Sequence, residues 1–153
     1  MAIDITTNKH NVAFPSKVKS SICGHIYNLV LLANADNGEL FSKGDYVSFD
    51  NYKAAAAPVN FAGIIREQAR NGNWYVEVTE PAGALFAYNS PVSPYSEREL
   101  QDEALFFNKT GDVVQGMELS VGDMVELSET AFNGTPVANK AVSYASKKYV
   151  VAS

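Results

Sequence analysis

The chain of 153 residues has little of what metal and redox sites are built from. It has a single cysteine, Cys23, and only two histidines, His10 and His25. One cysteine excludes an internal disulfide, which fits a reducing compartment or a protein that is stable without cross-links. A structural zinc site normally takes four ligands at regular spacing, and these three residues do not supply them. We therefore expect no bound metal or other cofactor, and we interpret Cys23 as a small buried apolar group.

Positive charge and long hydrophobic runs are scarce as well. The formal net charge is −5, and the only basic clusters are the pairs Lys17/Lys19 and Lys147/Lys148. Because phosphate contacts need clustered Lys and Arg, no nucleic-acid partner is expected. The longest aliphatic run, residues 29–33, is far shorter than a membrane span, and the start of the chain lacks the pattern of a signal peptide. These absences predict a soluble protein that is made inside the cell and does not contact a membrane.

Catalytic motifs are also missing. The chain contains no nucleophile elbow, no phosphate-binding loop and no dinucleotide-binding fingerprint. The acidic pairs Glu97/Glu99 and Asp102/Glu103 are better interpreted as a solvated surface than as an acid–base dyad. We therefore expect no catalytic residue, and the chain is not predicted to be an enzyme.

What the sequence has is a series of short apolar segments separated by turn signals. Hydrophobic residues make up 46% of the chain and aromatic residues 11%, which is enough for a substantial core. The dipeptide Asn71-Gly72 predicts a type I′ hairpin turn, after which we expect Trp74 to pack on the body. Many short strands with closely spaced turns are typical of an all-β fold, here a small barrel or sandwich. The predicted strands are residues 26–32, 46–49, 61–67, 74–78, 84–88, 124–127 and 149–151.

Two segments allow more than one assignment. Residues 52–58 contain four consecutive alanines but end in a proline, which disfavours helix at the residue before it, so we expect a loop or a single turn. Ser96 and Glu99 have the spacing of a capping box and favour one short helix, whereas Phe106 and Phe107 equally suit a strand. The fold is thus expected to contain at most one short helix.

A pattern of Gly, five residues and Gly-Asp occurs twice, ending at Gly44-Asp45 and at Gly122-Asp123. Gly accepts positive φ and Asp can bond to nearby backbone, so both copies suit a tight turn that leads into a strand. We interpret them as equivalent turns in two related β units, with an accidental match as the alternative. The two halves would be residues 25–90 and 95–153.

Residues 1–24 are polar and rich in turn formers, with Pro15 in the middle and few regularly spaced apolar positions. Such a segment does not bury enough apolar surface to become ordered by itself. It either lies on its own body or reaches a neighbouring subunit. We expect a docking arm outside the folded body, which would be residues 25–153. Its apolar anchors would be Ile3, Ile5, Val12, Phe14 and Val18.

Part of the sequence resembles a known group of proteins. The succession Leu85-Phe-Ala-Tyr88-Asn-Ser-Pro91, then Tyr95, residues 101–116 and Gly122-Asp123, is similar to small β-rich structural proteins of tailed phages. These are the capsid decoration, auxiliary capsid and head-fibre-base proteins. The resemblance lies in turns and aromatic residues over roughly the last two-thirds of the chain, and it includes no active-site motif.

The resemblance implies a non-enzymatic virion structural protein that binds and stabilises a phage capsid or attaches a head fibre to it. The implied partner is the major capsid protein, with a head-fibre protein or further copies of this chain as additional candidates. The implied location is the virion capsid, after synthesis in the host cytoplasm. The alternative is a carbohydrate- or protein-binding β module of a phage fibre or tail, which would use exposed aromatic residues such as Trp74. The candidate partner-binding residues are Val12, Phe14, Val18, Tyr95, Phe106 and Phe107.

Overall fold

The computed structural model describes residues 2–3, 11–19, 24, 26–46, 53–58, 60–89 and 106–152. In these parts of the chain every regular element is a strand, except for one 3-10 turn at Glu129–Ala131. The predicted all-β class is therefore confirmed, and one of the sheets closes into a barrel. The segment for which a short helix was an option, residues 96–105, lies outside the described residues.

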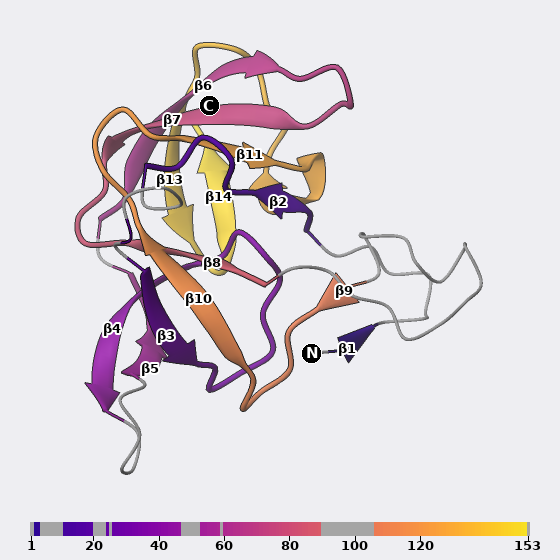
Figure 1. Ribbon diagram of the computed structural model, residues 1–153. Coiled ribbons are helices and arrows are strands. Elements are labelled where there is room, and N and C mark those ends of the chain that lie inside the picture. The colour runs from indigo at the N-terminus through magenta and orange to yellow at the C-terminus, as the bar shows by residue number, and fades with distance from the viewer. Residues whose placement is uncertain are drawn as a thin grey trace.

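Five strands form the barrel, which occupies the lower left and centre of Figure 1. Neighbouring strands are antiparallel, except for one parallel pair formed by β3 and β5. Closure removes the free strand edges that an open sheet of this size would present. In order around the barrel the strands are β10 (Val113–Glu118), β3 (Ile26–Val30), β5 (Lys53–Ala56), β4 (Leu40–Tyr46) and β8 (Leu85–Tyr88).

The prediction of a loop or single turn at residues 52–58 is wrong, because Lys53–Ala56 forms a strand. This strand, β5, pairs with both β3 and β4. The approach to β4 is close: a Cβ on Gly44 would lie 2.7 Å from the carbonyl oxygen of Ala54. Small residues on both strands permit that approach, and pairing on two sides overrides the weak strand preference of alanine.

The other large sheet has seven strands and lies above the barrel in Figure 1. A separate pair joins β1 (Ala2–Ile3) to β9 (Phe106–Phe107), so the strand alternative for the two phenylalanines is confirmed. The order in the large sheet is β12 (Phe132–Asn133), β14 (Lys148–Val151), β13 (Ala141–Ala145), β6 (Ala62–Gln68), β7 (Trp74–Glu80), β11 (Met124–Leu127) and β2 (Ala13–Phe14).

Most of the predicted strands are confirmed, and three strands of the large sheet are not among the predicted ones. These are β13, whose outward residues are polar or small, and β2 and β12, which have only two residues each. Of the predicted strand at 46–49, only Tyr46 is described, as the last residue of β4. The confirmed segments are 26–32, 61–67, 74–78, 84–88, 124–127 and 149–151.

Strand β8 joins the barrel to the large sheet because both of its faces are buried. Leu85 and Ala87 point into the barrel, whereas Phe86 and the preceding Ala84 point into a larger core shared with the other sheet. All four side chains are at most 1% exposed. Side chains alternate between the faces of a strand, so a nearly continuous apolar run is required to fill two cores at once. The larger core also contains Leu40, Ile65, Val76, Val78, Val125, Leu127 and Tyr149.

The hairpin between β6 and β7 is confirmed, but its turn type differs from the prediction. Of the predicted pair, only Gly72 has positive φ, at 89°. Its N–H donates to the carbonyl of Ala69 (3.0 Å), and the N–H of Ala69 donates to Asn73 (2.7 Å). This geometry is a type I turn that continues into a glycine in the left-handed region, as in three-residue hairpin loops. Trp74 follows it and packs against the larger core, as expected.

The prediction of two equivalent Gly-Asp turns is wrong. Gly122 lies in a turn before β11 with φ of 93°, whereas Gly44 lies inside β4, at a shift of register against β5. The strands of the barrel and of the large sheet also alternate along the chain. Neither predicted half, residues 25–90 or 95–153, therefore forms one of the sheets by itself.

A different glycine pattern does recur. In three turns a glycine with φ near 90° precedes an acid, and the carboxylate accepts the N–H of the residue three positions earlier. The shared pattern has four positions: any two residues, then Gly, then Asp or Glu. It fits a type II turn in which the acidic side chain also bonds to the first residue of the turn. The nitrogen-to-carboxylate distances are 2.6 Å for Asp36–Glu39, 3.0 Å for Lys109–Asp112 and 2.8 Å for Ser120–Asp123.

For residues 11–19 the prediction of an arm outside the folded body is wrong. Strand β2 pairs with β11 at the edge of the large sheet. Ala13 is 2% exposed and Val18 is 1% exposed, and both belong to the larger core. The scattered apolar residues of this segment thus find their partners in distant strands, which the local sequence does not reveal. Residues 4–10 and 20–23 lie outside the described part of the chain.

Candidate functional site

The six candidate partner-binding residues do not form one surface. Val18 is buried in the core of its own chain, so it is not accessible to a partner in this fold. Val12 and Phe14 are half-buried, and Phe14 lines a different hollow from Phe107. Phe106 lies on β9 opposite Ile3, and Tyr95 lies outside the described residues.

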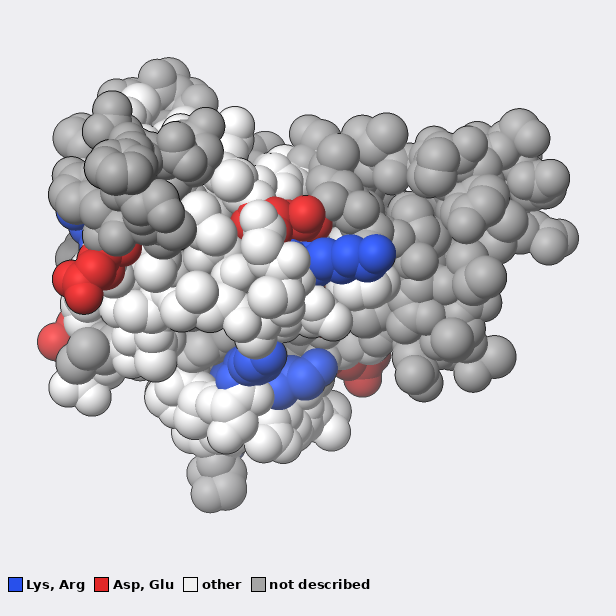
Figure 2. Space-filling view, turned by 90° about the horizontal axis from the view of Figure 1, so that it is seen from below, with Lys and Arg blue, Asp and Glu red and all other residues white. Residues whose placement is uncertain are grey.

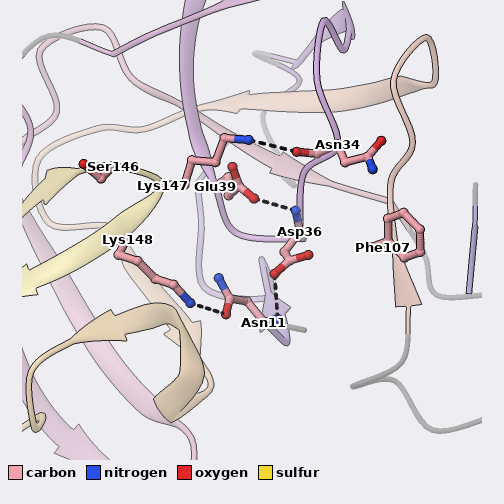
Figure 3. Close-up of a pocket in the computed structure, with 8 residues that line it drawn as sticks. All are labelled: Asn11, Asn34, Asp36, Glu39, Phe107, Ser146, Lys147 and Lys148. Atoms are coloured by element: carbon pink, nitrogen blue, oxygen red, sulfur yellow. Dashed lines mark hydrogen bonds between the residues drawn. The ribbon is translucent and has the colours of Figure 1, made fainter. Parts of the chain in front are cut away.

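A hollow lined by several charged and polar side chains lies where the loop from β3 to β4 meets the turn from β13 to β14 (Figure 3). We call it the polar hollow; it encloses about 450 Å³. A neighbouring apolar hollow of about 340 Å³ shares three lining residues with it, namely Glu39, Ser146 and Lys147. The polar hollow is also lined by Asn11, Asn34, Asp36, Phe107 and Lys148. The apolar hollow is also lined by Leu40, Phe41, Ala55, Ala56, Ala57, Pro58, Tyr144 and Ala145.

A network of three asparagines holds the loop from β3 to β4. Asn37 and Asn108 are 3% and 0% exposed. The Asn37 amide donates to the carbonyl of Asn89 (2.8 Å), and its oxygen accepts from the Asn89 N–H (3.0 Å) and the Asn108 amide (3.2 Å). The Asn89 amide donates in turn to the Asn108 side-chain oxygen (3.2 Å). A buried polar network with its members paired in this way fixes one loop conformation.

Glu39 lies between the two hollows and is only 5% exposed. Its Oε2 accepts the N–H of Asp36 (2.6 Å), but its Oε1 is buried and has no hydrogen-bond partner among the described residues. Burial raises the pKa of Glu39 to about 7; the Asp36 N–H and the two nearby lysines oppose this shift, and the Asp36 charge adds to it. A carboxylate with one unpaired buried oxygen is costly, so this group is half-protonated near neutral pH instead of fully ionised.

The turn from β13 to β14 places two lysines at the hollows. Ser146 and Lys147 both have positive φ, at 52° and 64°, in a two-residue turn where Asn and Gly are usual. The Lys147 ammonium donates to the carbonyl of Asn34 (3.1 Å), and the Lys148 ammonium donates to Asn11 (3.4 Å). In Figure 3 the Lys147 side chain extends past the Glu39 carboxylate to reach Asn34, and the unpaired oxygen of Glu39 is on the side of that lysine.

Tyrosines from β13 and β14 lie behind the carboxylate. The hydroxyl of Tyr149 donates to the carbonyl of Gly38 (2.6 Å). Burial raises the pKa of Tyr144, and the negative charge of Glu39 adds a smaller rise. Burial also raises the pKa of Tyr149. Both tyrosines are therefore neutral at physiological pH, and Tyr149 is the one whose hydroxyl donates to the loop.

Other kinds of site find no support in the parts of the chain that the structure covers. Among those residues, no three His, Cys, Asp or Glu side chains lie close enough to hold a metal ion. The described segments also include no helix with the length and apolar character needed to cross a membrane. Trp74, on which the carbohydrate-binding alternative depends, packs against the core, and its indole nitrogen is buried.

A second surface lies on the outside of the barrel, along β3 and β10. Leu32 is 67% exposed and Val113 is 38% exposed, and they are neighbours because the N–H of Leu31 donates to the carbonyl of Asp112 (3.0 Å). Val113 lies opposite Val30 in the ladder. We use the name barrel face for six residues, none of which is charged: Ile26, Asn28, Val30, Leu32, Val113 and Gln115. Figure 2 shows a broad uncharged area of the surface, with charged side chains in a few separate places.

Glu39 was not singled out as a functional residue by the sequence. The usable signal is an acid between the turn glycine Gly38 and an apolar strand, a place where a carboxylate becomes buried.

Comparison of the chain with protein-family models, with curated proteins and with solved structures gave no match.

Proposed function

We propose that the chain is a non-enzymatic structural protein of a phage virion that binds the major capsid protein through the barrel face. The observation that carries the proposal is the exposure of Leu32, two residues after the end of β3, beside Val113 of β10, where the ladder between the two strands contains no charged residue. Contiguous exposed apolar side chains on a folded protein mark interaction surfaces. The resemblance of the segment from Leu85 to Asp123 to capsid decoration proteins supplies the class of partner.

The architecture is suited to this role. A surface that does not change shape on binding favours attachment to a lattice, since ordering a surface on binding costs affinity. The barrel face lies on a closed barrel, and the asparagine network next to it fixes the loop that follows Leu32. In the proposed complex the barrel face is covered by the capsid, and the apolar area removed from water stabilises attachment.

A double substitution tests the proposal. We expect Leu32→Asp with Val113→Asp to reduce the affinity for capsids that lack the protein by at least about tenfold, since a carboxylate would be buried at each position. Co-sedimentation with such capsids measures the affinity. Both residues are exposed in the free protein, so circular dichroism and the melting temperature should change little.

Val121→Asp is the matched control. Val121 is 73% exposed and lies in the turn beyond the opposite end of β10. It should leave capsid binding unchanged. Normal binding by the double variant, or an equal loss with Val121→Asp, would show that the barrel face is not the attachment surface.

A further inference from the structure

We propose that the polar and apolar hollows form one peptide-binding groove, in which a lysine or arginine of a partner protein pairs with Glu39 and displaces the side chain of Lys147. The inference rests on the proposed function in one respect only, in that the occupant is taken to be a protein. The site differs from the barrel face and uses other residues.

The first argument is the unpaired oxygen of Glu39. Its Oε1 is buried and accepts no hydrogen bond from the described residues, although its other oxygen does. Buried polar atoms in folded proteins are nearly always paired, and an unpaired one calls for a donor that the free chain does not provide. A cationic N–H group is the strongest donor to a carboxylate.

The second argument is the position of Lys147. It lines both hollows, and its ammonium is held at 3.1 Å from a backbone carbonyl of Asn34, not by the carboxylate beside it. A lysine side chain changes rotamer readily, and its departure would join the two hollows around Glu39.

The third argument is the chemistry of the walls. The charged or titratable groups that face Glu39 are Asp36, Tyr144, Lys147, Lys148 and Tyr149. Both lysines are already bound to oxygens of this chain, so an entering cation meets the Glu39 carboxylate. The Asp36 carboxylate lies beside it and already accepts the N–H of Asn11. The adjoining hollow is lined by aliphatic and aromatic side chains. The fitting ligand is therefore an extended segment with a basic residue next to an apolar one.

The size of the hollows agrees with this occupant. Their volumes of about 450 and 340 Å³ are each within the range of small-ligand sites. Together they are large enough for one long basic side chain and a neighbouring apolar residue.

The test uses the full ¹⁵N-labelled chain and an acetylated, amidated tetrapeptide of sequence Ala-Leu-Arg-Ala, titrated to millimolar concentration. The matched probe carries citrulline in place of arginine, which keeps the shape and removes the charge. We expect the arginine peptide to shift the amide signals of Glu39, Ser146 and Lys147 and to bind at least about tenfold more tightly than the citrulline peptide. Glu39→Gln should abolish that preference.

Lys147→Ala tests whether the Lys147 side chain competes with the ligand. A lysine with a purely structural role would not be expected to weaken peptide binding by its presence. Removing the competing side chain should tighten binding of the arginine peptide severalfold, whereas Lys140→Ala, which removes one exposed lysine elsewhere, should have no effect. Equal binding of the two peptides, absence of shifts at these amides, or weaker binding by Lys147→Ala would overturn the inference. The peptide titration contains no capsid, so a negative result would not count against capsid binding through the barrel face. In the same way, a negative result in the capsid co-sedimentation would not count against peptide binding in the groove.

Discussion

Glu39→Gln should stabilise the folded chain by about 3 kcal/mol at pH 8, although it removes a charge and a potential ion-pair partner. Burial raises the pKa of this carboxyl to about 7 from an ordinary value of 4.5. The folded chain therefore bears the cost of an ionised, half-paired carboxylate at pH 8, whereas the unfolded chain ionises it in water. A neutral amide of the same shape avoids most of that cost.

The sign of the pH dependence follows from the same shift. Between pH 4.5 and about 7 the folded chain holds a proton that the unfolded chain has released, so stability rises as the pH is lowered through this window. The advantage of Glu39→Gln over the wild type should thus be largest above pH 7 and should vanish below pH 4.5. Urea unfolding of both proteins at several pH values measures it.

Glu129→Gln is the control for loss of a carboxylate, because Glu129 is exposed in the turn before β12. It should change stability by less than about 0.5 kcal/mol. If Glu39→Gln were destabilising at pH 8, the Glu39 carboxylate would have to be paired in solution, and the argument for the groove would lose its first support.

Gly38→Ala should destabilise the chain by about 2–5 kcal/mol, the second large effect we expect. Gly38 has φ of 89°, and a Cβ there would lie 2.7 Å from the Cβ of Ala13 and 2.9 Å from Leu127. Its N–H donates to Ala87 (2.8 Å) and its carbonyl accepts from Tyr149 (2.6 Å), so the backbone is not free to move away. The free-energy costs of backbone strain and of overpacking therefore add at this position.

Gly111→Ala separates the two contributions. Gly111 has the same φ of 89°, but a Cβ there would meet no atom within 4 Å. Its substitution should cost only the backbone strain, about 1–2 kcal/mol. Thermal or denaturant unfolding of both variants gives the comparison. Equal losses would mean that the contacts around Gly38 relax and that packing at this point is loose.

The sequence predicts the elements that local periodicity encodes. Strands such as β7, where Val76 and Val78 alternate with polar residues, are recognisable because one face is buried. β5 is not predictable in this way, because its alanines carry no such signal and it is a strand only through its pairing with β3 and β4. β2 was missed because its partner strand lies more than a hundred residues away, at β11.

The candidate site was less predictable than the fold. Glu39, Lys147 and Asn11 are distant in the sequence and meet only through the packing of the loops, so no spacing rule relates them. The sequence predicts a partner contact for Val18, because an apolar residue in a polar segment has no visible local contact, whereas in the fold it is buried in the core of its own chain. A resemblance in turns and aromatic residues suggests a class of protein, but it does not identify which surface is used.

The shared strand β8 has a consequence for how the molecule comes apart. The two faces of β8 contribute to two cores. Opening the barrel would therefore remove Phe86 from the larger core, and opening the large sheet would displace the strand that carries Leu85 into the barrel core. The chain should therefore unfold as a single cooperative unit, with no stable half-open species. Fluorescence of Trp74, the only tryptophan, reports on the large sheet, and far-ultraviolet circular dichroism reports on both; the two curves should coincide. The amide protons of β8 should exchange with solvent only through global unfolding, so the barrel is not a separable module.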